Sequence, residues 1–159
     1  MRRVLVIACV VVGLAWGQEP RLAPMNDTLC GPRCLWLAAT KLGRDVSLES
    51  LISMAKVDAK KGTSVKNMLE VARGIGLTGQ IVRTDVSAIG RDPRCAILIV
   101  DDHSHFVFVK DILGGAVTVI DGHEIKTLAA DPLRKRWQGE AIMVGAPGMP
   151  LTEARGPVW

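Results

Sequence analysis

A β-hairpin is encoded by residues 105–121, which read HFVFVKDILGGAVTVID. Two apolar runs rich in β-branched residues, 106–110 and 116–120, are joined through a Gly-Gly pair, which is typical of a turn between two strands. In an antiparallel hairpin the start of the first strand lies beside the end of the second. We therefore expect His105 and Asp121, which stand at the two ends of the stretch, to lie next to each other.

Helical patterns precede this hairpin, and further strand patterns lie on both sides of it. The predicted helices span 31–42, 48–55 and 65–72, and the predicted strands span 80–83, 96–100, 106–110, 116–120 and 141–144. Ser47 is suited to cap the second helix and either Thr63 or Ser64 the third, whereas Pro32 fits the first turn of the first. Because helices come first and strands second, we expect an α+β domain rather than an alternating βαβ fold.

The first 17 residues have the three-part pattern of a secretory signal peptide. Two arginines precede an apolar run of about 13 residues, which is shorter than the roughly 20 needed to span a bilayer as a helix. We expect 1–17 to be removed, 18–145 to form one domain and 146–159 to be a Pro/Gly-rich tail, with the mature protein exported to the periplasm or secreted. The alternative is an uncleaved membrane anchor, which would be the protein's membrane contact.

Composition sets limits on the function. A chain of 159 residues suits one domain, and its 23% of charged residues is ordinary for a globular protein. The net charge of +4 includes two arginines of the signal segment, and aromatic residues make up only 4% of the chain, so nucleic acid is not an expected partner. The phosphate-binding pattern Gly-x-x-x-x-Gly-Lys-Ser/Thr is absent, so we expect no ATP site, and nothing in the sequence indicates a cofactor.

Three cysteines lie beyond the signal segment, and an odd number leaves at least one thiol unpaired in an oxidising compartment unless it pairs between chains. Cys30 stands at the start of the first predicted helix, where the positive end of the helix favours a thiolate. A thiolate nucleophile usually needs a base and a partner that orients the base. His105 and Asp121 are suited to these roles, whereas Cys34 and Cys95 are expected in the core or in a disulfide.

Several motifs together resemble the bacteriocin-processing cysteine peptidase domain, a papain-like domain that cleaves leader peptides after a double glycine. They are Cys30-Gly31-Pro32-Arg33-Cys34-Leu35, Val46-Ser47-Leu48-Glu49-Ser50-Leu51, Gly62-Thr63-Ser64, Gly76-Leu77, His105-Phe106-Val107-Phe108-Val109, Val119-Ile120-Asp121 and Trp137-Gln138-Gly139-Glu140-Ala141. The resemblance covers about residues 26–144 and implies helices packed on an antiparallel sheet. It also implies a peptide or protein substrate and a thioester intermediate, with Cys30 as nucleophile, His105 as general base and Asp121 as its orienting partner.

The chain departs from the family pattern at two places. Pro24 occupies the position six residues before the cysteine, where the family usually has a glutamine that stabilises the oxyanion, and Asn26 is the candidate to replace it. Gly122 follows Asp121, where the family commonly has proline. A lost oxyanion donor costs on the order of 100–1,000-fold in rate. A catalytically degenerate, peptide-binding module of the same fold is therefore the alternative function.

Two other functions share some of these residues. Cys30 and Cys34 could form a redox pair, although their spacing places them on successive helical turns and no βαβ unit precedes them. Both cysteines could bind a metal together with His103 and His105, whose alternation on one strand would direct both rings to one face, although the set lacks the close cysteine pairs of common zinc sites. On the same reasoning His103 is the backup base.

Overall fold

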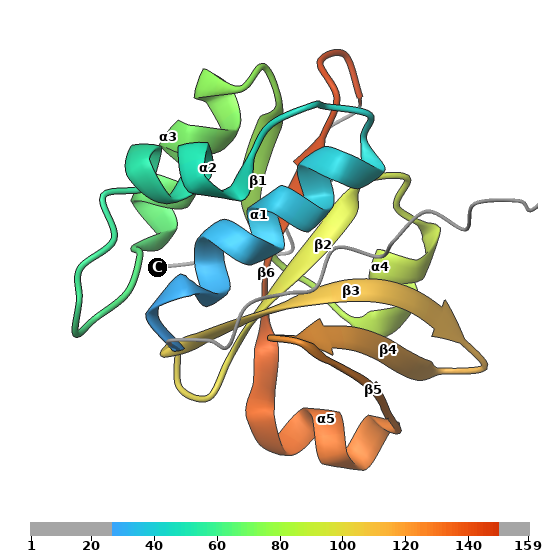
Figure 1. Cartoon of the computed structure of the whole chain (residues 1–159). Helices are drawn as coiled ribbons and strands as arrows, with labels where there is room; N and C mark the ends of the chain where they lie inside the picture. The colour runs from blue at the N-terminus through green and yellow to red at the C-terminus, as the bar shows by residue number, and fades with distance from the viewer. Residues whose placement is uncertain (1–26, 150–159) are drawn as a thin grey trace, which may run out of the picture.

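A computed structural model of the chain describes residues 27–149, which form one antiparallel sheet with helices on both faces (Figure 1). The six strands lie in the order β1-β6-β2-β3-β4-β5, and every neighbouring pair is antiparallel. The elements in chain order are η1 (Asp27–Leu29), α1 (Cys30–Lys41), α2 (Leu48–Met54), α3 (Val65–Gly74), β1 (Thr78–Arg83), α4 (Val86–Arg91), β2 (Cys95–Val100), β3 (His105–Leu113), β4 (Ala116–Asp121), β5 (Glu124–Leu128), α5 (Ala130–Arg136) and β6 (Trp137–Gly145).

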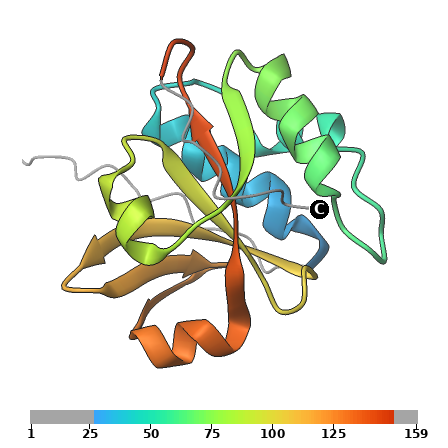
Figure 2. The same cartoon turned by 180° about the vertical axis from the view of Figure 1, so that it is seen from behind.

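The helices divide between the two faces of the sheet. α1 crosses one face against β2 and β3, with α2 and α3 beside it (Figure 1). α4 and α5 lie on the opposite face, as the view from behind shows (Figure 2). This arrangement leaves β2 and β3 in the middle of the sheet and places the N-terminal end of α1 near the start of β3.

Two apolar clusters, one on each face, hold these layers together. Leu35 of α1 packs in the cluster that contains Ile97, whereas Ile89 of α4 and Leu133 of α5 pack in the cluster that contains Leu98. Successive side chains of a strand point to opposite faces, so β2 contributes to both clusters in turn, and all six of its residues are buried. Burial on both faces explains why this strand reads as a continuous apolar run.

Three helices begin at a side-chain cap, and α1 does not. Ser47, Ser64 and Asp85 each accept a hydrogen bond from the backbone N–H three residues later, and so cap α2, α3 and α4. Leu29 occupies the corresponding position before α1 and offers no side-chain acceptor, and the first turn of α1 carries no acidic residue. The positive end of α1 is therefore left for Cys30, its first residue.

The predicted fold class is confirmed, because helices pack on an antiparallel sheet. The three N-terminal helices and the first four predicted strands lie close to their predicted positions, but β6 begins at Trp137, four residues before the prediction. The simple order of helices followed by strands is wrong, because α4 and α5 interrupt the run of strands. α4, β5 and α5 were not predicted.

Weak local signals explain these three omissions. α4 has a cap in Asp85, but it is only six residues long and includes Gly90, so it shows little helical periodicity. β5 is an edge strand of mixed charged and apolar residues, most of them exposed or half-buried. α5 begins without a side-chain cap and carries Pro132 in its first turn, a position where proline is tolerated but which is easily read as a loop.

Some sequence predictions fall on residues outside the described range. These are the signal peptide at 1–17, Pro24, Asn26 and the part of the tail from residue 150 onward. Within residues 27–149, the helices are all too short or too polar to cross a membrane.

Candidate active site

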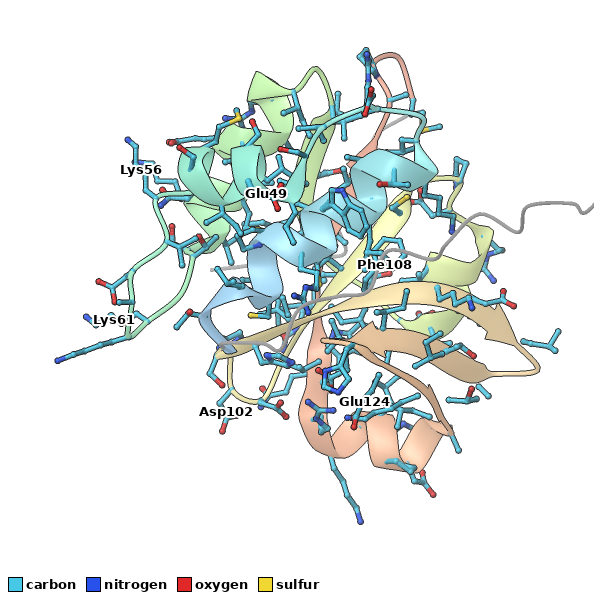
Figure 3. The ribbon with its side chains drawn as sticks, viewed as in Figure 1. Glu49, Lys56, Lys61, Asp102, Phe108 and Glu124 are labelled. Atoms are coloured by element: carbon cyan, nitrogen blue, oxygen red, sulfur yellow. The ribbon has the colours of Figure 1, made fainter. Side chains whose placement is uncertain are left out.

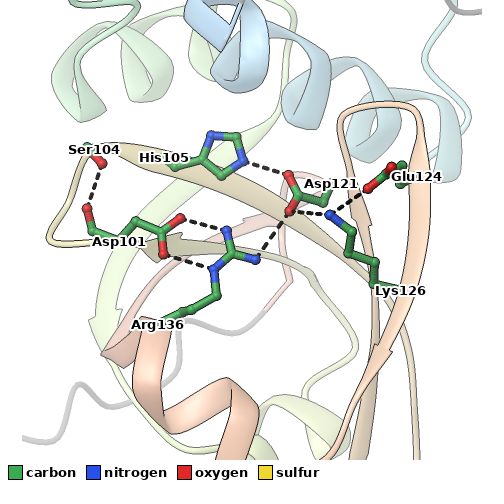
Figure 4. Close-up of polar contacts among 7 residues, drawn as sticks. All are labelled: Asp101, Ser104, His105, Asp121, Glu124, Lys126 and Arg136. Atoms are coloured by element: carbon green, nitrogen blue, oxygen red, sulfur yellow. Dashed lines mark hydrogen bonds and ion pairs between the residues drawn. The ribbon is translucent and has the colours of Figure 1, made fainter.

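The ends of β3 and β4 bring an imidazole and a carboxylate together. His105 is the first residue of β3 and Asp121 is the last residue of β4, and the two strands pair as a hairpin. The ring nitrogen Nε2 of His105 lies 2.6 Å from Oδ1 of Asp121 (Figure 4). The predicted proximity of these two residues is therefore confirmed.

Cys30 completes the arrangement from the opposite layer. It begins α1, and its thiol lies beside the ring of His105, whose pKa it raises. Because Nε2 of the ring faces Asp121, the ring nitrogen left for the thiol is Nδ1. Cys30 is 6% exposed, yet it lines a cleft, so the sulfur is sheltered but not sealed in the core. The structure thus brings Cys30, His105 and Asp121 together, with the ring bonded to the carboxylate and the thiol beside the ring.

The surroundings of His105 favour its protonated form. The hydrogen bond with Cys30 and the hydrogen bond with Asp121 outweigh the effect of burial and raise the pKa of His105 to about 9. An imidazolium beside a sulfur stabilises the thiolate form of that sulfur, which is the nucleophilic form of cysteine. Near neutral pH the ring of His105 therefore carries a positive charge beside the sulfur of Cys30.

Asp121 is surrounded by cations. Burial acts to raise the pKa of its carboxyl, but the hydrogen bond and the charge of His105, together with Arg136 and Lys126, lower the pKa overall. Arg136 Nη1 lies 3.3 Å and Lys126 Nζ lies 3.4 Å from Oδ2, the oxygen that His105 does not use (Figure 4). Asp121 is therefore held as a carboxylate at the pH values where the site would work.

The cleft beside Cys30 has a volume of about 350 Å³. Its lining residues are Thr28, Cys30, Lys60, Lys61, Gly62, Thr63, His103, Ser104 and Phe106. One wall is a tight loop closed by hydrogen bonds between Asp58 and Gly62, from which Lys61 projects away from the body of the molecule (Figure 3). Gly62 has a φ of +71° and packs so closely on Thr28 that an added Cβ would lie 3.1 Å from the carbonyl oxygen of Thr28. The wall therefore has room only for glycine at this point.

The other two described cysteines are core residues. Cys30, Cys34 and Cys95 are all free thiols, so Cys34 and Cys95 form no disulfide with each other or with Cys30. Complete burial, reinforced by the neighbouring Cys30 and Asp121, raises the pKa of the Cys34 thiol well above its usual range, and burial also raises the pKa of Cys95. Neither residue lines the cleft, so Cys30 is the described cysteine suited to react with a substrate there.

His103 does not share a strand face with His105, and that expectation is wrong. β3 begins at His105, so His103 lies in the β2–β3 turn, where its φ is +66° and the strand alternation does not apply. Its Nε2 lies 3.9 Å from Oε2 of Glu140 on β6. Within residues 27–149, no group of three or more His, Cys, Asp or Glu side chains is arranged to hold a metal ion.

Sequence reasoning missed the residues that surround Asp121. Arg136 donates to Asp101 through Nε at 2.8 Å and Nη2 at 2.6 Å, and its third nitrogen reaches Asp121 (Figure 4). Lys126, on the neighbouring strand β5, contacts the same carboxylate. Arg136 ends the unpredicted α5 and Lys126 lies on the unpredicted β5, so no pattern in the sequence indicated that either would approach the hairpin.

A larger cavity, of about 650 Å³, lies on the opposite face of the sheet. Its walls include Val86 of α4, Leu133 of α5 and Trp137 at the start of β6. It contains none of Cys30, His105 and Asp121. We place the candidate active site at the smaller cleft, because Cys30 lines it and His105 lies beside Cys30.

Comparison with known families gives one match. The sequence model described as the Peptidase C39 family matches residues 21–147. No curated protein matches the chain.

Three solved structures of similar fold are peptidase domains. A double glycine motif protease from an AMS/PCAT transporter, crystallised with the leader peptide, has a TM-score of 0.69 and 19% identity, over 77% of this chain and 88% of that one. The peptidase domain of Streptococcus ComA, a bi-functional ABC transporter involved in quorum sensing, has a TM-score of 0.67 and 17% identity, over 77% and 95%. The N-terminal peptidase C39 like domain of a Vibrio parahaemolyticus toxin secretion ATP-binding protein has a TM-score of 0.61 and 16% identity, over 77% and 99%. At these identities the likeness shows a shared fold.

Proposed function

Since this chain belongs to the peptidase C39 family, we propose that it hydrolyses peptide bonds with Cys30 as nucleophile, His105 as general acid and base, and Asp121 as the residue that orients the ring. The observation that carries the proposal is the 2.6 Å contact between His105 and Asp121, with the thiol of Cys30 beside the same ring. A thiol, an imidazole and a carboxylate in this order are the groups that thiol acyl transfer requires.

The reaction has two stages. The Cys30 thiolate attacks the peptide carbonyl carbon, and the protonated His105 donates its proton to the departing amine, which leaves a thioester on the sulfur. His105 then accepts a proton from water as that water attacks the thioester, so the acid is released and the thiolate is restored. Asp121 keeps the ring oriented and stabilises the imidazolium throughout.

The oxyanion of each tetrahedral intermediate needs hydrogen-bond donors. The uncapped start of α1 supports the proposal, because the N–H groups of its first turn are not taken by a side chain of Leu29 and lie at the positive end of the helix. Asn26 is our candidate for a second donor, in the region where the family usually has glutamine and this chain has Pro24. Asn26→Ala should lower kcat by roughly 100-fold if this amide donates to the oxyanion.

We propose a peptide substrate that is cleaved after Gly-Gly. The support comes from similar structures, one of which is a double glycine motif protease crystallised with the leader peptide. We also propose, from the signal-peptide pattern at residues 1–17, that the protein acts after export, or on the membrane if that segment is not cleaved.

Incubation of the full chain with a library of peptides that contain Gly-Gly sites tests this function. Fragments that end in Gly-Gly should accumulate with the wild type and not with Cys30→Ser. If peptides bind but neither protein cleaves them, the chain is instead a degenerate peptide-binding module, the alternative that Pro24 raises. If neither binding nor cleavage occurs with any peptide, the proposed function is wrong.

A further inference from the structure

The turn between β2 and β3 has an unusual backbone and lies directly before His105. Asp101, Asp102 and His103 have φ values of +52°, +53° and +66°, which place three successive non-glycine residues in the left-handed region. Such residues are uncommon, and they persist only where surrounding contacts hold them. Because His105 follows two residues after His103, the contacts that hold this turn also set where the imidazole stands.

The end of α5 and the beginning of β6 supply those contacts. Arg136 forms a two-pronged hydrogen bond with Asp101, with distances of 2.8 Å and 2.6 Å, and the backbone N–H of Asp101 donates to the carbonyl of Arg136 at 2.8 Å. Gln138 Nε2 donates to Asp102 at 3.3 Å, which is a weaker contact. Of these contacts, the Arg136–Asp101 pair is the strongest, because a guanidinium matches a carboxylate in both geometry and charge.

Arg136 also reaches the candidate catalytic residues. Its remaining nitrogen, Nη1, lies 3.3 Å from Oδ2 of Asp121. The other oxygen of Asp121, Oδ1, is hydrogen-bonded to His105. One guanidinium therefore contacts both the turn that precedes His105 and the carboxylate that faces His105 (Figure 4). A single planar group thus fixes the positions of the two structures between which the imidazole lies.

We propose that Arg136 is a positioning residue of the peptidase, one that holds the β2–β3 turn and Asp121 in register so that His105 is directed at Cys30. This inference rests on the proposed function. It makes Arg136 more than a source of positive charge beside Asp121. A lysine can supply the same charge but cannot form the paired hydrogen bonds to Asp101 and reach Asp121 together.

Three variants separate position from charge. Arg136→Gln removes both the positive charge and the paired hydrogen bonds to Asp101, whereas Arg136→Lys keeps the charge and removes the paired hydrogen bonds. Lys126→Gln removes a different cation that contacts the same oxygen of Asp121, and it leaves the β2–β3 turn unchanged. Lys135→Gln is the matched control, because Lys135 is the exposed neighbour of Arg136 on α5 and lies outside the network of Figure 4. Thermal unfolding of each variant checks that the fold is retained.

The first measurement is the rate at which iodoacetamide alkylates Cys30 at pH 6, relative to the rate at pH 10, where thiols ionise without help. We expect this ratio to fall roughly tenfold or more in both Arg136 variants. Lys126→Gln should lower it less, and Lys135→Gln should leave it unchanged. In a peptide-cleavage assay, kcat should fall in the Arg136 variants while KM stays within about twofold. Full recovery of the wild-type ratio and kcat in Arg136→Lys would show a role of charge alone and overturn the proposal.

The second measurement does not depend on catalysis. The NMR titration of the His105 ring should move to lower pH in both Arg136 variants, because the ring loses its fixed place between Cys30 and Asp121. A wild-type His105 titration in Arg136→Gln overturns the positioning role. Failure of the wild type to cleave any peptide would count against the proposed function, and the NMR comparison would still decide whether Arg136 positions the ring.

Discussion

His105 and Asp121 are sixteen residues apart in the sequence, and Nε2 of the first lies 2.6 Å from Oδ1 of the second. The hairpin of β3 and β4 brings them together, and the contact leaves Nδ1 to face Cys30. The imidazole therefore has one side for the thiol and one for the carboxylate.

His105 and His103 should respond differently to the same substitution. His105→Ala should lower kcat/KM by roughly 100-fold or more, because the thiol loses its proton acceptor and the leaving amine loses its proton donor. His103→Ala should retain most of the activity, since His103 lies in the turn and pairs with Glu140 instead. Steady-state cleavage of one Gly-Gly peptide by the two variants checks this. A severe loss in His103→Ala with little loss in His105→Ala would reassign the base.

Alkylation of the native protein should be confined to one cysteine. Cys30 lines the cleft beside an imidazole, whereas burial raises the pKa of the Cys34 thiol well above its usual range and keeps Cys95 protonated to higher pH. Iodoacetamide at mildly acidic pH should therefore give one adduct, which peptide mass spectrometry should locate at Cys30. Cys34→Ala should preserve this labelling and most of the activity. An adduct at Cys34 of the native protein would contradict the described core.

The free energy of unfolding should fall between about pH 6.5 and about pH 9 because of His105. The pKa of this residue is raised to about 9 in the folded protein by its hydrogen bonds to Cys30 and Asp121, above the roughly 6.5 expected when unfolded. Because the pKa of His105 is higher in the folded protein, protonation of the ring stabilises the fold fully at pH values below the pKa of the unfolded state. This stabilisation is lost as the pH rises through the pKa of the folded state. Urea unfolding at several pH values measures the decline. The pKa values of Cys34 and Cys95 are also raised, and these thiols lower the free energy of unfolding further only above about pH 8.5.

The matched variants for this pH dependence are His105→Asn and His103→Asn. The first should flatten the decline between about pH 6.5 and about pH 9, because the group that titrates is gone. The second should keep the decline. A slope that is the same in wild type and His105→Asn would show that another group is responsible.

Replacing Arg33 by methionine should stabilise the protein. Arg33 is 3% exposed, and its Nε and Nη1 make no hydrogen bond, so burial lowers the pKa of its guanidinium. Removing buried polar atoms that lack partners should raise the free energy of unfolding by roughly 1–3 kcal/mol. Arg73→Met, at an exposed position on α3, should change it by less than about 0.5 kcal/mol. Urea unfolding distinguishes the two, and a clear loss of stability in Arg33→Met would contradict this prediction.

The hairpin is the part of the site that the sequence predicts best. Strand alternation and the Gly-Gly turn are local signals, and they suffice to bring His105 to Asp121. The start of α1 is local as well, and it predicts the place of Cys30 in the helix. Cys30 meets His105 because α1 lies across β3. Only the resemblance to a known family predicts this packing.

Contacts that depend on strand order were not predictable from local patterns. Arg136 reaches Asp101 because β6 pairs with β2, and a neighbour 35 residues away in the sequence leaves no periodic signal. The place of His103 was mispredicted because the left-handed turn ends just before β3, and nothing in the letters Asp-Asp-His marks such a turn.

The last strand of the chain lies between the first and second strands, β1 and β2. During synthesis, the residues proposed for catalysis therefore leave the ribosome before the strand that joins β1 to the rest of the sheet, and before Arg136. Such long-range pairing delays assembly until nearly all of the domain has been made. We therefore expect the proposed nucleophile and base to gain their final arrangement only after residue 145 has emerged.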